Sequence, residues 1–271
     1  MMTASLRNNV RIIGEGEPTF LFSHGFGCDQ SMWRHVAGHF ANPGRVVLFD
    51  HVGAGGSDIS AYDPQAHATL NGYARDVIDI CESLNLRDVI FIGHSVSATI
   101  GVLAANARPD LFRQLVLICA SPRYANTDSY DGGFSEADID ELLDLMDKNH
   151  LDWSALMAPT VVGADHPEVQ TEWRDSVCRT DPAIAKAFAR VTFTSDHRAD
   201  YRKVTTPTLL IDCSDDALAP EAVGRYVHAA IAGSRRVVLT AEGHCPHMTA
   251  PDEVVEAIAS LTTPSDLTVA A

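Results

Sequence analysis

The residue best suited to covalent chemistry is a serine that lies between two small residues. Residues 88–98 read DVIFIGHSVSA, so Ser95 follows an apolar run of strand length and precedes a helical stretch. Gly93 and Ser97, two positions to either side, leave room for a sharp turn that would expose the Ser95 hydroxyl. The alternative is that Ser95 only caps the following helix. The strand before it and the helix after it favour a nucleophile.

A serine hydroxyl is a weak nucleophile, so it needs a histidine base and a carboxylate that orients this base. Asp215 and Asp216 come after the apolar run at 207–213, where a parallel strand would deliver them to the ligand-binding edge of a sheet. His244 and His247 follow a later strand-like run. The order Ser, Asp, His is known for such triads. Residue types alone leave two candidates for the acid and two for the base.

The sequence also contains candidates for an oxyanion hole. A strand, a sharp turn at a serine and a helix form the nucleophile elbow of α/β-hydrolases, in which the residue after the nucleophile gives one oxyanion-hole N–H. That residue is Val96 here. The second N–H comes from a loop after an early strand, which corresponds to Phe26 in the segment HGFG at 24–27. The alternative is a plain strand-to-helix turn, but the His-Gly pair directly after the first long strand favours the oxyanion hole.

Alternating strands and helices are needed to bring these segments together. Strand-like apolar runs, typical of parallel strands buried on both faces, alternate in the first half with helical stretches. The strands are expected at 18–23, 45–49, 88–92 and 113–119, and the helices at 29–40, 68–85 and 95–107. This order predicts an α/β fold with a mostly parallel, doubly wound sheet. The run Val10 to Ile13 is predicted to form an antiparallel hairpin with the next strand.

The alternation stops after residue 122 and resumes at 207–213, which indicates a helical insertion. Its helices are expected at 135–150, 152–162, 167–178 and 182–194, and the resumed pattern predicts a helix at 220–231, a strand at 235–240 and a helix at 251–261. The first inserted helix has an apolar face and an acidic face, the latter exposed to solvent. We therefore predict one discontinuous α/β-hydrolase core over 1–122 and 200–262, a four-helix lid over 123–199 and a flexible tail over 263–271.

Composition limits the classes of partner and the cellular compartment that we expect for the protein. The net charge of −16 argues against nucleic acid, because phosphate contacts need clustered Lys and Arg. No apolar stretch is long enough for a membrane span, and the opening residues lack the apolar core of a signal peptide. The six cysteines are scattered, with no metal-ligand spacing, and no cluster of His, Asp and Glu calls for a metal. We expect a cytoplasmic, reduced protein that needs no cofactor.

Several longer motifs resemble one group within the α/β-hydrolases. The chain is similar to the bacterial stress-response regulator RsbQ and to the plant strigolactone and karrikin receptors, and the likeness covers nearly the whole chain. The matching segments are HGFGCDQSMW at 24–33, FDHVGAGGSD at 49–58, GHSVSATIG at 93–101, RPDLF at 108–112, SYDGGF at 129–134, TDPAIAKAF at 180–188, FTSDHR at 193–198, CSDDALAP at 213–220 and EGHCPHM at 242–248.

The resemblance implies a choice between the open candidates. It places the acid four residues before Pro220, which is Asp216, and the base directly after Gly243, which is His244. It also implies a V-shaped lid over a deep, mainly apolar pocket. The residues that would line this pocket are Phe26, His94, Val96, Tyr124, Phe134, Trp153, Met157, Phe193 and Leu218.

Two functions of different classes follow from these observations. The first is a serine hydrolase that cleaves a small apolar ester or lactone through an acyl-enzyme on Ser95. The second, implied by the resemblance, is a ligand-responsive signalling protein with slow hydrolysis, whose lid docks a partner such as a PAS-domain phosphatase. A third reading is other chemistry on the same fold, such as C–C bond hydrolysis or cofactor-free haloperoxidase activity.

Overall fold

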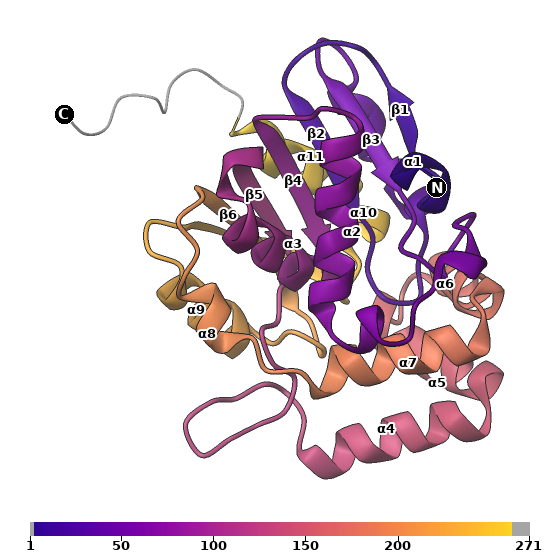
Figure 1. Ribbon diagram of the computed structural model, residues 1–271. Coiled ribbons are helices and arrows are strands. Elements are labelled where there is room, and N and C mark those ends of the chain that lie inside the picture. Colours follow the sequence, from indigo (N-terminus) through magenta and orange to yellow (C-terminus); the bar gives the residue numbers. More distant parts are fainter. Residues whose placement is uncertain (1–2, 262–271) are drawn as a thin grey trace.

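A single, mostly parallel sheet organises the molecule. The computed structural model describes residues 3–261, and the predicted tail at 263–271 lies outside them. Within the described residues the sheet has seven strands in the order β1-β3-β2-β4-β5-β6-β7 (Figure 1). β1 is antiparallel to β3, and the other neighbours are parallel, which confirms the predicted α/β class. The strands are Arg11–Ile13 (β1), Thr19–Ser23 (β2), Arg45–Phe49 (β3), Val89–His94 (β4), Phe112–Ile118 (β5), Thr208–Asp215 (β6) and Arg235–Glu242 (β7).

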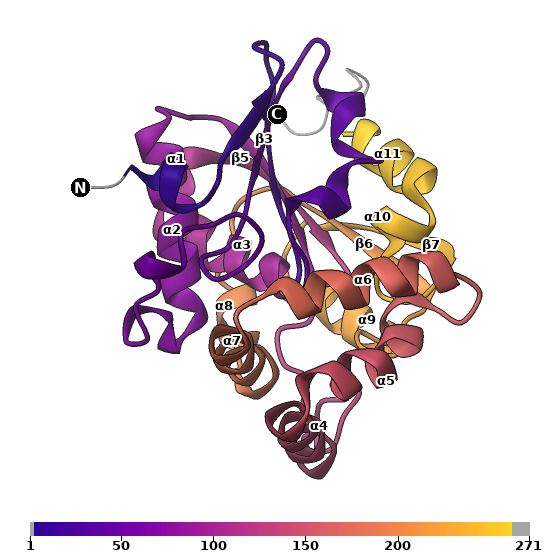
Figure 2. The same ribbon diagram turned by 90° about the vertical axis from the view of Figure 1, so that its right-hand side faces the viewer.

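Helices cover both faces of the sheet (Figure 2). Successive side chains along a strand point to opposite faces, so each buried strand serves two apolar cores. In β4, Ile90 and Ile92 belong to the core that includes α10 and α11, whereas Phe91 belongs to the core that includes α2, α3 and α9. The helices outside the insertion are Ala4–Arg7 (α1), Leu70–Ser83 (α2), Val96–Ala107 (α3), Arg198–Tyr201 (α8), Glu221–Ala230 (α9), Pro246–Thr249 (α10) and Pro251–Ala259 (α11).

Four of the five helices that lie between β5 and β6 in the chain gather at the carboxyl ends of the strands (Figure 1). They are Glu136–Lys148 (α4), His150–Val162 (α5), Pro167–Arg179 (α6) and Pro182–Thr194 (α7). α4 contacts α5 and α7, and α5 contacts α6. A capping box between Ser135 and Asp138 begins α4, which buries Ile139, Leu143 and Met146. We call these four elements the inserted helices.

Two local predictions were wrong. The run at 10–13 does not pair with β2, because β3 and β4 already occupy both edges of β2; β1 pairs instead with the outer edge of β3, with Ile13 opposite Val46. The helix expected over 29–40 consists of two short 3₁₀ helices, η1 and η2, and Gly38, a poor helix former, lies in the second. The 3₁₀ helices are Gln30–Trp33 (η1), Ala37–Phe40 (η2), Ile59–Ala61 (η3), Ala66–Ala68 (η4) and Pro109–Leu111 (η5).

Candidate active site

Ser95 lies at the tip of a sharp turn between β4 and α3. Its φ of 57° and ψ of −124° form a backbone conformation that residues other than glycine rarely adopt. A β-carbon on Gly93 would lie 2.5 Å from the Ser97 carbonyl oxygen, so strand and helix approach this closely only with glycine there. The Ser95 side chain makes no capping hydrogen bond to α3. The hydroxyl is thus left for contacts outside the helix, contrary to the capping alternative.

The three predicted triad residues meet at the carboxyl ends of β4, β6 and β7. His244 Nε2 lies 2.7 Å from Ser95 Oγ, and His244 Nδ1 lies 2.7 Å from Asp216 Oδ2. All three side chains are buried. The backbone N–H of His244 donates to the Val161 carbonyl of α5 at 2.7 Å, so an inserted helix helps to hold the histidine. The result is a continuous hydrogen-bonded chain from carboxylate to hydroxyl.

His244 and the local backbone together favour the ionised form of Asp216. Burial raises the pKa of Asp216, but the charge and hydrogen bond of His244 and the N–H groups of Ala219 and Leu218 outweigh burial, so that this pKa lies below its usual value. The Leu218 N–H donates to Asp216 Oδ1 at 2.8 Å, and the Ala219 N–H donates to the same oxygen at 3.0 Å. The Asp215 side chain is exposed. Of the two adjacent carboxylates, Asp216 is therefore the one that reaches His244.

Two further histidines lie beside His244. His94 Nε2 donates to the His244 carbonyl at 2.7 Å. Burial, followed by the charge of His244, lowers the pKa of His94 to about 3, so His94 is neutral. His247 is also buried, and within the described residues neither of its ring nitrogens has a hydrogen-bond partner. Its ring packs against those of Trp33 and His94, with centroids 4.6 and 4.3 Å away. His247 is therefore a packing residue, not a competing base.

The loop after β2 lies directly against the elbow. A β-carbon on Gly25 would lie 2.5 Å from His94 Nδ1 and 3.3 Å from Ser95 Cβ, so only glycine permits this approach. Among residues 3–261, the N–H groups of Phe26 and Val96 donate to no protein acceptor. Two unused N–H groups near a nucleophile are what an oxyanion hole requires.

A narrow, mostly apolar cavity opens onto Ser95. Its empty space, including its opening to solvent, is about 410 Å³. Seven residues predicted to line it do so: Phe26, His94, Tyr124, Trp153, Met157, Phe193 and Leu218. The Tyr124 hydroxyl, a polar group outside the triad, lies 3.4 Å from Ser95 Oγ.

The remaining lining residues differ from the sequence-based set. In the described part of the chain, the lining lacks Phe134, whose backbone N–H donates to the Tyr124 carbonyl at 3.2 Å. It also lacks Val96. The group of Val96 that could serve the site is its backbone N–H, as an oxyanion-hole donor, and not its side chain. The lining gains residues that no local motif marks, because their place depends on how the inserted helices and the β7 end pack. These are Val161, Trp173, Thr192 and Cys245.

One group of possible metal ligands occurs in the described residues, namely Cys119, Asp216 and His244. Both ring nitrogens of His244 are already engaged by Asp216 and Ser95. Burial, followed by the neighbouring Cys213 thiol, raises the pKa of Cys119 well above its usual value, which disfavours the thiolate that binds metals. The arrangement fits a proton relay better than a metal site.

The sequence matches the Alpha/beta hydrolase family over residues 20–257. The chain belongs to this family. This α/β-hydrolase is 41% identical over 250 residues to the Karrikin insensitive 2 receptor CA of Petunia hybrida, an alignment that covers 92% of this chain and 93% of that protein. It is 36% identical over 249 residues to the Strigolactone esterase D14 of Arabidopsis thaliana, with 92% and 93% covered.

The chain is also similar to a solved structure of a hydrolase. The α/β-hydrolase has a TM-score of 0.93 and 40% identity to olei00960, a hydrolase from Oleispira antarctica, with 95% of each chain covered. These likenesses confirm the predicted resemblance to karrikin and strigolactone receptors and the assignment to hydrolases of the esterase kind. In the part of the chain that the structure describes, no helix is long and apolar enough to cross a membrane.

Proposed function

We propose that this α/β-hydrolase cleaves a small apolar ester or lactone through an acyl-enzyme on Ser95. The observation that carries the proposal is the hydrogen-bonded chain from Asp216 through His244 to Ser95, with 2.7 Å at each step, at the wall of an apolar cavity. An apolar cavity with few polar groups selects hydrophobic ligands and orients them through those groups. The Ser95 hydroxyl is then placed against the ligand's one electrophilic carbonyl.

Acylation begins when Ser95 Oγ attacks the carbonyl carbon while His244 Nε2 takes the hydroxyl proton. The electron pair of the C=O bond moves to its oxygen and forms a tetrahedral oxyanion, which the Phe26 and Val96 N–H groups stabilise. Each such donor is worth about 3 kcal/mol in the transition state. The oxyanion collapses, the C–O bond to the leaving alcohol breaks, and the alcohol takes the proton from His244. For a lactone, that alcohol stays attached to the acyl group.

Deacylation repeats these steps with water as the nucleophile. His244 removes a proton from water, whose oxygen attacks the acyl carbon, and returns it to Ser95 Oγ as the acid leaves. Asp216 stays ionised, because its pKa lies below the usual value despite its burial. It therefore stabilises the imidazolium that forms in each half of the reaction. His94 supports the same histidine through its hydrogen bond to the His244 carbonyl.

We also propose that the inserted helices act as a lid. Trp153 and Met157 on α5, Trp173 on α6 and Phe193 on α7 all line the cavity, so these helices form the walls that exclude water from an acyl-enzyme. A shift of α5 would also move the Val161 carbonyl that holds the His244 backbone. Lid position and base position are thereby linked.

Hydrolysis of p-nitrophenyl acetate and butyrate tests the proposal. The substitution Ser95→Ala should lower kcat by at least about 10³-fold, because the remaining site retains only binding and oxyanion stabilisation. Ser154→Ala is a matched control: Ser154 is buried on α5, its hydroxyl donates to the Leu151 carbonyl, and it lines no part of the cavity. A Ser95→Ala protein that keeps more than a few per cent of the activity would exclude Ser95 as nucleophile.

A second function, ligand-responsive signalling, is favoured by the receptor name of the Petunia hybrida relative. In this proposal slow hydrolysis serves sensing, as the resemblance to RsbQ implies, and the lid surface docks a partner such as a PAS-domain phosphatase. The six free cysteines fit a reducing compartment such as the cytoplasm. Turnover far below the typical range of about 1–10³ s⁻¹, with a raised melting temperature in the presence of a bound lactone, would support sensing. Turnover within that range would favour a metabolic hydrolase.

A further inference from the structure

A set of polar side chains lies buried beside the nucleophile elbow. We call Ser23, His24, His51 and Ser97 the elbow network; each is at most 1% exposed. They come from three segments: the end of β2, the loop after β3 and the first turn of α3. The proposed reaction gives none of them a proton to carry. Because buried polar groups are costly unless hydrogen-bonded, a network this deep needs a structural or functional reason.

Ser97 Oγ is the centre of the elbow network. It donates to the His24 carbonyl at 2.5 Å and accepts from Ser23 Oγ at 2.8 Å. His51 Nε2 lies 2.8 Å from the same oxygen. Because the single hydroxyl hydrogen of Ser97 goes to His24, the His51 nitrogen must be the donor in this contact. With one bond donated and two accepted, the Ser97 hydroxyl is saturated and held in one orientation.

The two histidines of the network are fixed in complementary tautomers. Desolvation lowers the pKa of His51 well below its usual value, so His51 is neutral, and its contact with Ser97 places its hydrogen on Nε2. The His51 backbone N–H donates to His24 Nε2 at 3.1 Å. His24 therefore carries its hydrogen on Nδ1, which donates to the Gly25 carbonyl at 2.9 Å.

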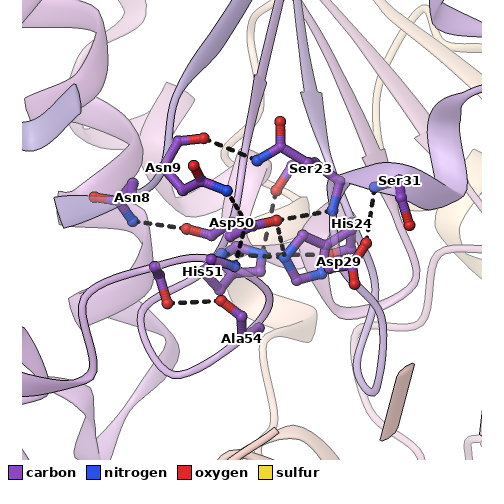
Figure 3. Close-up of polar contacts among 12 residues, drawn as sticks. Asn8, Asn9, Ser23, His24, Asp29, Ser31, Asp50, His51 and Ala54 are labelled. Carbon is purple, nitrogen blue, oxygen red and sulfur yellow. Dashed lines mark hydrogen bonds and ion pairs between the residues drawn. The ribbon is translucent and has the colours of Figure 1, made fainter. Parts of the chain in front are cut away.

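The surrounding loops support these histidines. Figure 3 shows Asp50 beside His24 and His51, with Asn8 and Asn9 bonded to it from the N-terminal segment. Asn9 Nδ2 donates to Asp50 Oδ2 at 2.7 Å, and Asn8 Nδ2 donates to the Asp50 carbonyl at 3.0 Å. These hydrogen bonds from the N-terminal segment hold the loop that carries His51. His51 can in turn hold Ser97 in place.

The elbow network spans the two backbone segments that would form the oxyanion hole. Ser97 directly follows Val96, and His24 lies two residues before Phe26. The Ser97–His24 hydrogen bond therefore joins the first turn of α3 to the loop after β2. Glycine, the usual residue at the Ser97 position of the elbow motif, has no hydroxyl to make this bond.

We propose that Ser97, held by His51, is a positioning residue that sets the distance between the two oxyanion-hole N–H groups. This inference rests on the proposed function. Loss of the Ser97 hydroxyl frees the loop after β2 to move relative to α3, so the Phe26 N–H no longer matches the developing oxyanion. Substrate binding in the apolar cavity depends on side chains elsewhere and is largely kept. The effect therefore falls on kcat and not on KM.

The test compares Ser97→Ala and Ser97→Gly with the unaltered enzyme on p-nitrophenyl butyrate. We expect kcat to fall about tenfold with KM within about twofold, since displacement of a donor costs less than its removal. Phenylboronic acid forms a tetrahedral adduct with a reactive serine and places an oxygen where the oxyanion would lie. Its Kd should rise by the same factor as kcat falls, because both measure the fit of the oxyanion hole.

Thr99→Val provides the matched control. Thr99 lies on the same helix, α3, and is equally buried, but its hydroxyl bonds to the Ser121 carbonyl at 3.1 Å and the Tyr201 hydroxyl at 2.9 Å. The loss of these buried bonds should lower the melting temperature without changing kcat or the Kd of phenylboronic acid. A merely structural role for Ser97 predicts that Ser97→Ala behaves in the same way.

Two substitutions of His51 test the positioning role of Ser97 without altering Ser97 itself. Gln places an amide nitrogen near the position of an imidazole Nε2, so His51→Gln should keep the donor to Ser97 and retain most of kcat. His51→Leu removes that donor and should lower kcat as Ser97→Ala does. All assays are run well below each variant's melting temperature, so a folding defect is not read as a catalytic one.

Two outcomes would overturn the inference. One is an unchanged kcat and an unchanged Kd for phenylboronic acid in folded Ser97→Ala; the other is an equal loss of kcat in Thr99→Val. Failure of the proposed function looks different, because Ser95→Ala would then remain active. An inactive Ser95→Ala beside a fully active Ser97→Ala would reject only the positioning role.

Discussion

Two serine–histidine pairs lie at the start of the same helix, and only one is arranged to react. Ser95 Oγ is 2.7 Å from His244 Nε2, and Ser97 Oγ is 2.8 Å from His51 Nε2. All four side chains are buried. The heavy-atom distances therefore do not distinguish the nucleophile from its neighbour.

The other ring nitrogen and the direction of the hydroxyl hydrogen do distinguish them. His244 Nδ1 faces the Asp216 carboxylate, which leaves Nε2 able to accept a proton from Ser95. The Ser97 hydrogen is directed to a backbone carbonyl, and within residues 3–261 His51 Nδ1 has no hydrogen-bond partner. A serine beside a histidine becomes a nucleophile only where a carboxylate sets the tautomer that can receive its proton.

Removing the carboxylate charge should make the reactive pair resemble the unreactive one. In Asp216→Asn the amide N–H can donate to His244 Nδ1, which shifts the hydrogen of His244 to Nε2 and prevents proton acceptance from Ser95. We expect kcat for p-nitrophenyl butyrate to fall about 10⁴-fold, the largest effect in this set apart from loss of Ser95 itself. Asp215→Asn, on the adjacent exposed carboxylate, is the control and should change kcat little. The opposite ranking of the two variants would exchange their roles.

The reactive pair was accessible to sequence reasoning because its signals are local. Ser95 follows a continuous apolar strand and precedes a helix. The candidate acids lie at the end of β6 and the candidate bases follow β7, at the same edge of the parallel sheet. The choice between Asp215 and Asp216 could not be made from the neighbouring residue types alone. It depends on a register shift near the end of β6 and on the turn that brings the Leu218 N–H to Asp216.

The unreactive pair could not be predicted from the sequence. Ser97 reads there only as a small substitute for glycine, and nothing near His51 marks it as buried. Their contact depends on the sheet order β3-β2-β4, which places the ends of three strands side by side. The pairing of β1 with β3 and the place of Trp173 in the cavity wall likewise depend on packing between segments that are distant in sequence.

The reactive pair also depends on a hydrogen bond that His94 donates to the backbone of His244. His94→Phe keeps a packed ring but removes the N–H donated to the His244 carbonyl. The unpaired carbonyl should lower the free energy of unfolding by about 1–3 kcal/mol. Displacement of the base should lower kcat about tenfold. His247→Phe, at the neighbouring ring, removes no hydrogen bond and should leave kcat nearly unchanged. Equal losses of kcat in the two variants would show that ring packing, and not the hydrogen bond, positions His244.

The smallest effect expected is on the pH dependence of stability, and it comes from a buried imidazole that has no carboxylate beside it. Burial lowers the pKa of His247 well below its usual value. Below about pH 6.5 the unfolded chain therefore binds a proton at His247 that the folded chain does not, so this histidine makes stability fall as pH falls. The slope from one such group approaches about 1.4 kcal/mol per pH unit.

His247→Phe should remove that contribution. Urea unfolding at several pH values between about 5 and 7 should show a shallower loss of the unfolding free energy in the variant, with no penalty at neutral pH, because no hydrogen bond is lost. His35→Phe is the control, since His35 is exposed and its replacement should leave the slope unchanged. An unchanged slope in His247→Phe would mean that His247 is protonated in the folded protein. Such a charge beside His94 and His244 would then have to be included in the electrostatics of the reactive pair.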